Sequence, residues 1–223
     1  MFPPSFPPRA LVLLVLSACA HPPPLPVQSG HGLTHRFDNP EEWAPRFEDP
    51  ARDFWQKPDE VIAALKLKPN DRVADIGAAT GYFPVRLARA LPSGKIWGVD
   101  IEPEMTRYLA ARATTEGLPN LKAVLGTPED PQLPEKAELV LLVDTFHHIA
   151  HRSTYFENLK RHVATDGRLA IIDFKRDSPI GPPVEHRISA EEISDELKKA
   201  GWEKAEQHDF LPYQSFLIFT PVR

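Results

Sequence analysis

Short apolar runs alternate with amphipathic stretches from about residue 58 to the C-terminus. The apolar runs predict buried strands at 72–76, 95–100, 121–125, 138–144 and 168–174, with a final pair at 202–208 and 215–220. The stretches between them predict helices at 81–91, 104–116, 153–163 and 189–200, after a first helix that starts at 58. Ser189 and Glu192 form a capping-box pattern at the start of the last helix, and Gly201 follows its end.

This alternation predicts an α/β fold, a Rossmann-like seven-stranded and mostly parallel sheet with helices on both faces. No helical pattern separates the last two strands, so we expect them to pair antiparallel, which makes the last strand antiparallel in the sheet. Residues 36–223 then form one domain. The aromatic residues Trp43, Phe47, Phe54 and Trp55 punctuate the polar segment before the first helix and predict a flap that packs onto the domain.

Composition narrows the classes of function. The net charge is −5 and there is no long basic run, so we expect no nucleic acid partner, because phosphate binding needs clustered Lys and Arg. Hydrophobic residues make up 42% and charged residues 26% of the chain, which are values typical of a globular protein. The one cysteine, Cys19, excludes an intrachain disulfide and a cysteine-based zinc site.

The N-terminal segment has the pattern of an export signal. Arg9 precedes an apolar run at 10–16 that is too short to span a bilayer and is typical of a signal-peptide core. The run ends in Leu-Ser-Ala-Cys at 16–19, which resembles the bacterial lipobox. The resemblance implies a signal peptide at 1–18, cleavage before Cys19 and lipidation of its thiol, while an ordinary cleaved signal is the alternative.

Prolines at 22–24 and 26 make residues 19–35 proline-rich, which predicts an extended linker between the lipid and the folded domain. The lipobox resemblance thus implies a membrane-anchored lipoprotein on the periplasmic side of the bacterial cell envelope. Ala20, rather than an aspartate, follows Cys19 and favours the outer membrane.

A small-residue loop follows the first strand, at the edge where open α/β sheets bind ligands. Asp75, Gly77, Ala79 and Gly81 stand at alternate positions, and glycine lets a backbone approach a ligand closely. The run resembles methyltransferase motif I, D-x-G-x-G-x-G, with Ala79 in place of the middle glycine. Its spacing differs from the nicotinamide fingerprint G-x-G-x-x-G, which argues against a nicotinamide-dependent reductase.

The ends of the next two strands supply candidates for a nucleoside. Asp100 ends the second strand, where a carboxylate can accept both hydroxyl hydrogens of a ribose. Ile101 and Met105 are placed to flank an adenine. After the third strand, Thr127 stands where the family usually has an adenine-binding acid, which leaves Asp130 and Glu129 as candidates and a solvated turn as the alternative.

Acid–base groups gather after the fourth strand, in a run that resembles the family's motif IV. Asp144, His147 and His148 are the clustered groups there, and a neutral histidine can take a proton near pH 7. They are our catalytic candidates; the alternative is that one histidine packs and the other faces solvent. His147 and His151 have the i, i+4 spacing of metal ligands on a helix, but no third ligand is near in sequence, so we expect no metal.

Taken together, residues 36–223 resemble class I S-adenosylmethionine-dependent methyltransferases, in particular the branch of ubiquinone/menaquinone-biosynthesis C-methyltransferases and their small-molecule relatives. The resemblance implies a methyltransferase (EC 2.1.1.-) with S-adenosyl-L-methionine as cofactor and a small molecule as methyl acceptor. The cofactor-binding residues it implies are Asp75, Gly77, Ala79, Gly81, Tyr82, Asp100, Ile101, Asp130 and Asp144.

Export and this cofactor are in tension, because S-adenosylmethionine is not normally supplied outside the cytoplasm. Inefficient export or a periplasmic supply of the donor would each reconcile them. The alternative is a non-catalytic Rossmann-like binding module of the cell envelope, which the substitutions at Ala79 and Thr127 favour and the remaining motif residues oppose.

Overall fold

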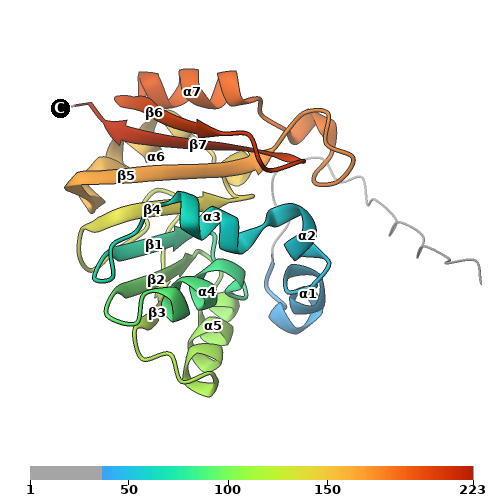
Figure 1. The fold of residues 1–223 in the computed structure, drawn as a ribbon, viewed down its shortest axis with the longest axis vertical. Helices are drawn as coiled ribbons and strands as arrows, with labels where there is room; N and C mark the ends of the chain where they lie inside the picture. Colours follow the sequence, from blue (N-terminus) through green and yellow to red (C-terminus); the bar gives the residue numbers. More distant parts are fainter. Residues whose placement is uncertain (1–36, 223) are drawn as a thin grey trace, which may run out of the picture. The chain divides into compact units, whose positions relative to one another are not determined.

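The computed structural model describes residues 37–222, and a seven-stranded sheet forms their centre, in the order β3-β2-β1-β4-β5-β7-β6 (Figure 1). The strands are β1 (Arg72–Ile76), β2 (Lys95–Asp100), β3 (Leu121–Leu125), β4 (Ala137–Val143), β5 (Val163–Phe174), β6 (Trp202–His208) and β7 (Gln214–Pro221). Pairing is parallel from β3 to β5, and β7 is antiparallel to both β5 and β6. The predicted fold class is confirmed, including the antiparallel pair at the end of the chain.

Helices cover both faces of the sheet. One face packs against α3 (Pro58–Ala64), α4 (Tyr82–Ala90) and α5 (Pro103–Thr115), and the other against α6 (Arg152–Leu159) and α7 (Ala190–Lys199). Two short helices, α1 (Pro40–Phe47) and α2 (Arg52–Gln56), precede α3. Single turns of 3₁₀ helix form η1 (Phe146–His148), η2 (Lys160–His162) and η3 (Val184–His186).

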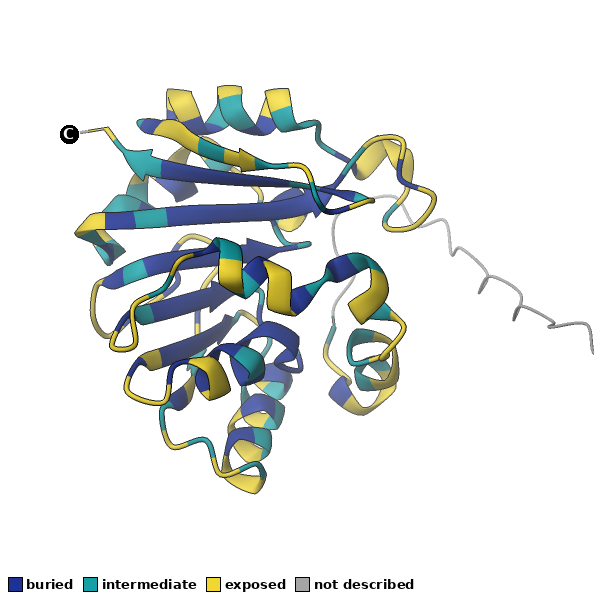
Figure 2. Ribbon diagram, in the orientation of Figure 1, coloured by how far each residue is buried: buried dark blue, intermediate teal, exposed yellow. Residues whose placement is uncertain are grey.

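Alternate residues of the central strands feed two separate cores, and the strands are buried along most of their length (Figure 2). In β4, Leu139 and Leu141 belong to the α3–α5 side, whereas Val140 and Leu142 belong to the α6–α7 side, and all four are fully buried. Because both faces are covered, the strand is apolar without alternation. Burying each such side chain contributes roughly 1.5–3 kcal/mol relative to leaving it exposed. This burial holds β4 in place, and with it the residues that follow its end at Val143.

The sequence predicted the ends of α7 correctly but the ends of α6 incorrectly. The capping box between Ser189 and Glu192 is present, and Gly201 follows α7 with φ +79°. At the expected 153–163 helix, His151 instead takes a left-handed conformation and α6 starts one residue earlier than expected, at Arg152. The same helix ends at Leu159, because β5 starts at Val163, which pairs with Ala137 before a register shift.

The export signal at 1–18, Cys19 and the linker at 19–35 lie outside the described residues. Within residues 37–222, each helix is too short or too polar to cross a lipid bilayer.

Candidate functional site

The loop after β1 keeps the backbone shape of a glycine-rich turn. Gly77 has φ +77° and Gly81 φ +102°, both in the left-handed region. Ala79 also lies there, with φ +45°, at a cost of roughly 1–2 kcal/mol for a residue with a side chain. A Cβ on Gly77 would come within 2.2 Å of Thr145 Oγ1, so this position has no room for any other residue. Ala79, which replaces the middle glycine of the motif, thus has the same left-handed conformation as Gly77 and Gly81.

Asp100 is held in place by this loop. Its Oδ2 accepts the N–H of Ala79 at 2.9 Å and its Oδ1 accepts the N–H of Glu102 at 3.0 Å. Burial raises the pKa of Asp100, and the backbone hydrogen bonds from Glu102 and Ala79 offset part of the shift. Each carboxylate oxygen retains capacity for a further donor, so an oriented acceptor pair stands at the end of β2.

Apolar surface lies beside Asp100. Ile101 is 53% exposed and Leu125, at the end of the adjacent β3, is 51% exposed. Two exposed aliphatic side chains at neighbouring strand ends suit the faces of a planar ring. Met105, the other residue placed to flank an adenine, is fully buried in α5 and presents no surface to a ligand.

Asp130 has a different environment. Its carboxylate forms ion pairs with Arg161 and with His162, the latter at 3.0 Å, and it accepts the N–H of Gln132 at 2.7 Å. These ion pairs direct it toward η2, which precedes β5, whereas the other candidates follow the ends of β1, β2 and β4. Adenine recognition by Asp130 stays a prediction.

The predicted flap consists of α1 and α2, and it reaches the loop after β1. Thr80 donates to Oε1 of Glu48 at 2.7 Å, and the Tyr82 hydroxyl donates to Asp53 at 2.5 Å. Trp55 contacts the ring of Phe174 with centroids 5.6 Å apart. Phe54 does not share in this packing, because it is 81% exposed.

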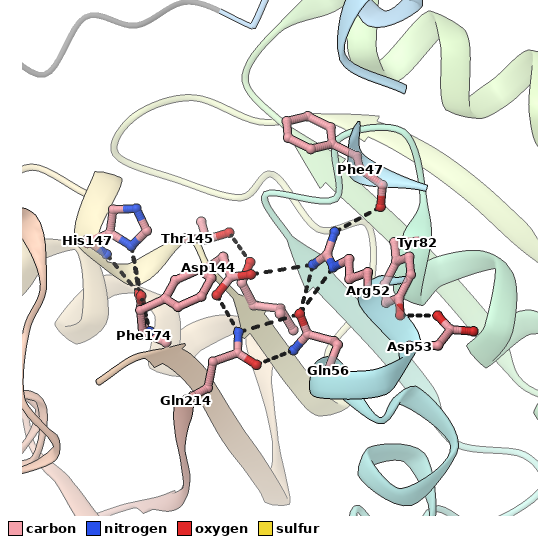
Figure 3. A network of polar contacts seen from close by, with 12 residues as sticks. Phe47, Arg52, Asp53, Gln56, Tyr82, Asp144, Thr145, His147, Phe174 and Gln214 are labelled. Atoms are coloured by element: carbon pink, nitrogen blue, oxygen red, sulfur yellow. Dashed lines mark hydrogen bonds and ion pairs between the residues drawn. The ribbon is translucent and has the colours of Figure 1, made fainter. Parts of the chain in front are cut away.

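Arg52 of α2 brings a positive charge into the site (Figure 3). Its guanidinium donates to the carbonyl oxygen of Phe47 at 3.0 Å and lies 4.1 Å from the centre of the Tyr82 ring. Its Nη2 lies 3.5 Å from Oδ2 of Asp144. The side chain is only 15% exposed, so water screens its charge weakly and it interacts strongly with nearby carboxylates.

A closed ring of polar contacts ties α2 to the sheet (Figure 3). Nε and Nη2 of Arg52 donate to Oε1 of Gln56, and Gln56 donates to Oε1 of Gln214 at 2.6 Å. Gln214, on β7, donates to Oδ1 of Asp144 at 2.5 Å, and Arg52 closes the ring. Both glutamines are fully buried, so each depends on these partners for its hydrogen bonds.

The charge of Arg52 affects two carboxyl groups: that of Asp75, which is buried, and that of Asp144, whose side chain is 20% exposed. Burial raises the pKa of Asp75 to about 8, while Arg52 lowers it and Asp100 raises it. Burial likewise raises the pKa of Asp144, while Arg52 lowers it and Asp173 raises it. Asp144 also takes a left-handed backbone conformation, with φ +54°. The raised pKa values mean that ionising either carboxyl is unfavourable here, and a cationic ligand beside them would favour the ionised forms.

The two histidines lie in different environments, as the packed-and-exposed alternative anticipated. His147 is 6% exposed and its Nδ1 lies 2.8 Å from Oδ1 of Asp173, which is fully buried on β5. Burial alone lowers the pKa of His147, but the hydrogen bond and charge of Asp173 outweigh it and the net pKa is raised. His148 is exposed, with its ring centroid 4.1 Å from that of His147.

Asp75, Gly77, Ala79, Gly81, Tyr82, Asp100, Ile101, Asp144, His147 and His148 therefore all follow or end β1, β2 and β4 at one edge of the sheet. The sequence does not predict the roles of four residues at this edge: Arg52, Gln56, Asp173 and Gln214. None lies in a motif, and the Gln56–Gln214 contact joins residues 158 positions apart.

Comparison with known proteins agrees with this arrangement. The family model described as "Methyltransferase domain" matches residues 67–213. A ubiquinone/menaquinone biosynthesis C-methyltransferase of Bordetella avium is 28% identical over 124 residues, which are 55% of this chain and 48% of the relative. The chain thus spans about half the length of that relative.

Two further comparisons cover more of the chain. A protein-L-isoaspartate O-methyltransferase of Methylorubrum populi is 30% identical over 166 residues, covering 73% of this chain and 65% of the relative. The crystal structure of a SAM-dependent methyltransferase from Aquifex aeolicus superposes with a TM-score of 0.77 at 26% identity. That match covers 84% of this chain and 100% of the Aquifex chain.

Proposed function

This chain belongs to the methyltransferase-domain family, and we propose that it transfers a methyl group from S-adenosylmethionine to a small-molecule acceptor. S-adenosylmethionine is the cofactor that the family and the fold imply. The observation that carries the proposal is the contact between Ala79 and Asp100. It holds a carboxylate at the end of β2, oriented by the loop after β1 and able to accept a pair of hydroxyls.

The residues at this edge fit the cofactor. Asp100 suits the ribose, and the exposed side chains of Ile101 and Leu125 suit the two faces of the adenine. Burial raises the pKa of Asp75 and Asp144, and the positive charges of a bound sulfonium and ammonium would favour the ionised form of each carboxyl. When bound, the cofactor supplies an already activated methyl group, so the protein's main task is to orient donor and acceptor.

His147 is the proposed general base for an acceptor that must lose a proton. A buried carboxylate at Asp173 is best satisfied by an N–H on Nδ1, which leaves Nε2 with a lone pair. Nε2 then takes the proton from the acceptor, and Asp173 stabilises the resulting imidazolium. The other acid–base groups proposed for the end of β4 are Asp144 and His148, whose ring is tilted at 41° to that of His147.

The similarity to a quinone-biosynthesis C-methyltransferase supports a small molecule as acceptor. The N-terminal pattern supports anchoring through a lipidated Cys19 on the periplasmic side of the bacterial envelope. Anchoring is tested by fractionating cells that make Cys19→Ala. We expect this variant to leave the membrane fraction and lose incorporated fatty acid. Ser17→Ala keeps a small residue in the lipobox and should stay membrane-bound.

Cofactor placement is tested by calorimetric titration of Asp100→Ala with S-adenosylhomocysteine. Losing a charged hydrogen-bond acceptor should weaken binding by roughly 10- to 100-fold. Asp195→Asn is the matched control, because it removes an exposed carboxylate of α7, outside the proposed cofactor site. Unchanged affinity in the Asp100 variant would remove Asp100 from the site. A folded protein that binds neither donor nor product would favour the non-catalytic binding module.

A further inference from the structure

The N-terminal helix α2 lies before the region matched by the family model, yet it places one guanidinium among the site's carboxylates. Arg52 lies between the loop after β1, where it stacks on Tyr82, and the end of β4, where it contacts Asp144. Its charge acts on Asp75 as well as on Asp144. Arg52 is thus shared by the ends of the two neighbouring strands β1 and β4.

The contacts that Arg52 makes leave capacity for a stronger acceptor. Its approach to Asp144 is a single contact of 3.5 Å, longer than the roughly 2.7–2.9 Å of a strong charge-assisted hydrogen bond. Its other partners, the Phe47 carbonyl and the Gln56 amide, are neutral. Gln56 accepts from Nε and Nη2, and the Phe47 carbonyl accepts one of the two N–H groups on Nη1. A carboxylate that accepts two parallel N–H groups is the partner a guanidinium binds best.

The order of the strands determines which part of the cofactor comes near Arg52. The sheet runs β3-β2-β1-β4, and the exposed side chains proposed for the adenine, Ile101 and Leu125, lie at the ends of β2 and β3. A nucleoside with its ribose at Asp100 and its base against these side chains therefore has the base on the β3 side. The rest of the molecule then extends past β1 toward β4. That part of S-adenosylmethionine ends in an amino-acid zwitterion. Arg52 and Asp144 form the opposite-charge pair that matches a carboxylate and an ammonium.

We propose that Arg52 binds the α-carboxylate of S-adenosylmethionine, with Asp144 facing the α-ammonium. This inference rests on the proposed placement of the cofactor at this edge. It makes α2 part of the donor site as well as a cover over it, because the closed ring through Gln56 and Gln214 fixes where the guanidinium lies. The long Arg52–Asp144 contact is then exchanged for contacts with the two charges of the ligand.

The test compares two ligands that differ at the amino-acid end. S-adenosylhomocysteine carries the zwitterion, whereas 5′-methylthioadenosine has the same nucleoside without it. By calorimetry, the full-length protein should bind S-adenosylhomocysteine more tightly. In Arg52→Gln, that affinity should fall by roughly 10- to 100-fold while affinity for 5′-methylthioadenosine changes by less than about threefold, because a charged hydrogen-bond partner is lost from one ligand only. Arg52→Lys keeps the charge without the planar fork and should lie between the two.

Arg86→Gln is the matched control. Arg86 also lies against the Tyr82 ring, at 4.0 Å, and also holds α2, but through Asp53. Its loss therefore loosens α2 without removing the charge near Asp144. The inference would be overturned if Arg52→Gln lost affinity for both ligands equally, or lost affinity for neither. So would a wild-type protein that binds both ligands equally, which does not depend on how the variant folds. If wild type binds neither ligand, the proposed cofactor site fails as well.

Discussion

Ala79 donates its backbone N–H to Oδ2 of Asp100 over 2.9 Å from a left-handed conformation with φ +45°. Glycine adopts this conformation freely, so Ala79→Gly relieves strain of roughly 1–2 kcal/mol and loses roughly 0.5–1 kcal/mol through the more flexible unfolded chain. We expect stability to stay equal or rise slightly in urea unfolding. Ala78→Gly is the control: Ala78 is buried without a positive φ, so that variant should be less stable. Equal destabilisation by both would contradict the strain assigned to Ala79.

Gly77 faces Thr145 so closely that Gly77→Ala should be costly. The new Cβ meets Oγ1 of Thr145 at 2.2 Å and also has to tolerate φ +77°, which together predict a loss of roughly 2–4 kcal/mol. Gly117→Ala separates the two effects, because Gly117 has φ +65° with nothing within 4 Å of the added Cβ. It should lose only the backbone part. Chemical denaturation of both variants checks this, and similar losses would show that the contact with Thr145 costs little.

The raised pKa of Asp75 makes the stability of the fold depend on pH. Burial raises its pKa from 3.8 to about 8 in the folded protein, so the folded state binds more protons than the unfolded state between these values. The contribution of Asp75 to the free energy of unfolding should therefore fall as pH rises from about 4 to about 8. The pKa of His147 is also raised in the folded protein. Its contribution to stability is therefore also lost as pH rises through that pKa.

Asp75→Asn isolates this effect. The variant has no carboxyl to ionise, so its urea midpoint should exceed that of wild type at pH 8 and match it more closely at pH 5. Asp177→Asn removes an exposed carboxylate and should follow the wild-type curve. An Asp75→Asn curve parallel to wild type would mean that the Asp75 carboxyl is not desolvated.

Asp173 and His147 form a second pair whose coupling can be measured directly. Burial lowers the pKa of His147, and the hydrogen bond and charge of Asp173 reverse the sign. In Asp173→Asn, burial should dominate and the pKa should fall below the ordinary value of about 6.5. Proton NMR titration of the His147 ring in wild type and in the variant checks this. A His147 pKa that stays raised would show that Asp173 does not control it.

The sequence was sufficient to predict the sheet and to place the candidate residues together at the ends of its strands. Buried strands are apolar on both faces, and the carboxyl ends of parallel strands meet at one edge, so the pattern alone groups Asp75, Asp100 and Asp144. Asp130 shows the limit of this reasoning. It follows the end of β3 in sequence, but Arg161 and His162 draw its carboxylate toward the start of β5.

Contacts between distant segments could not be predicted. Arg52 lies in a polar stretch without periodicity, and only the fold shows that it reaches Asp144, 92 positions away. Asp173 ends an apolar strand, where a solvated acid would have the same pattern. Its role depends on the left-handed turn at Asp144 and on η1, which bring His147 over β5.

The central claim is that this edge of the sheet binds S-adenosylmethionine, and calorimetric titration of the full-length protein with S-adenosylmethionine and S-adenosylhomocysteine tests it most directly. We predict that both bind with one site per chain and affinities in the micromolar range, on the order of −8 kcal/mol. A well-folded protein that binds neither would contradict the claim.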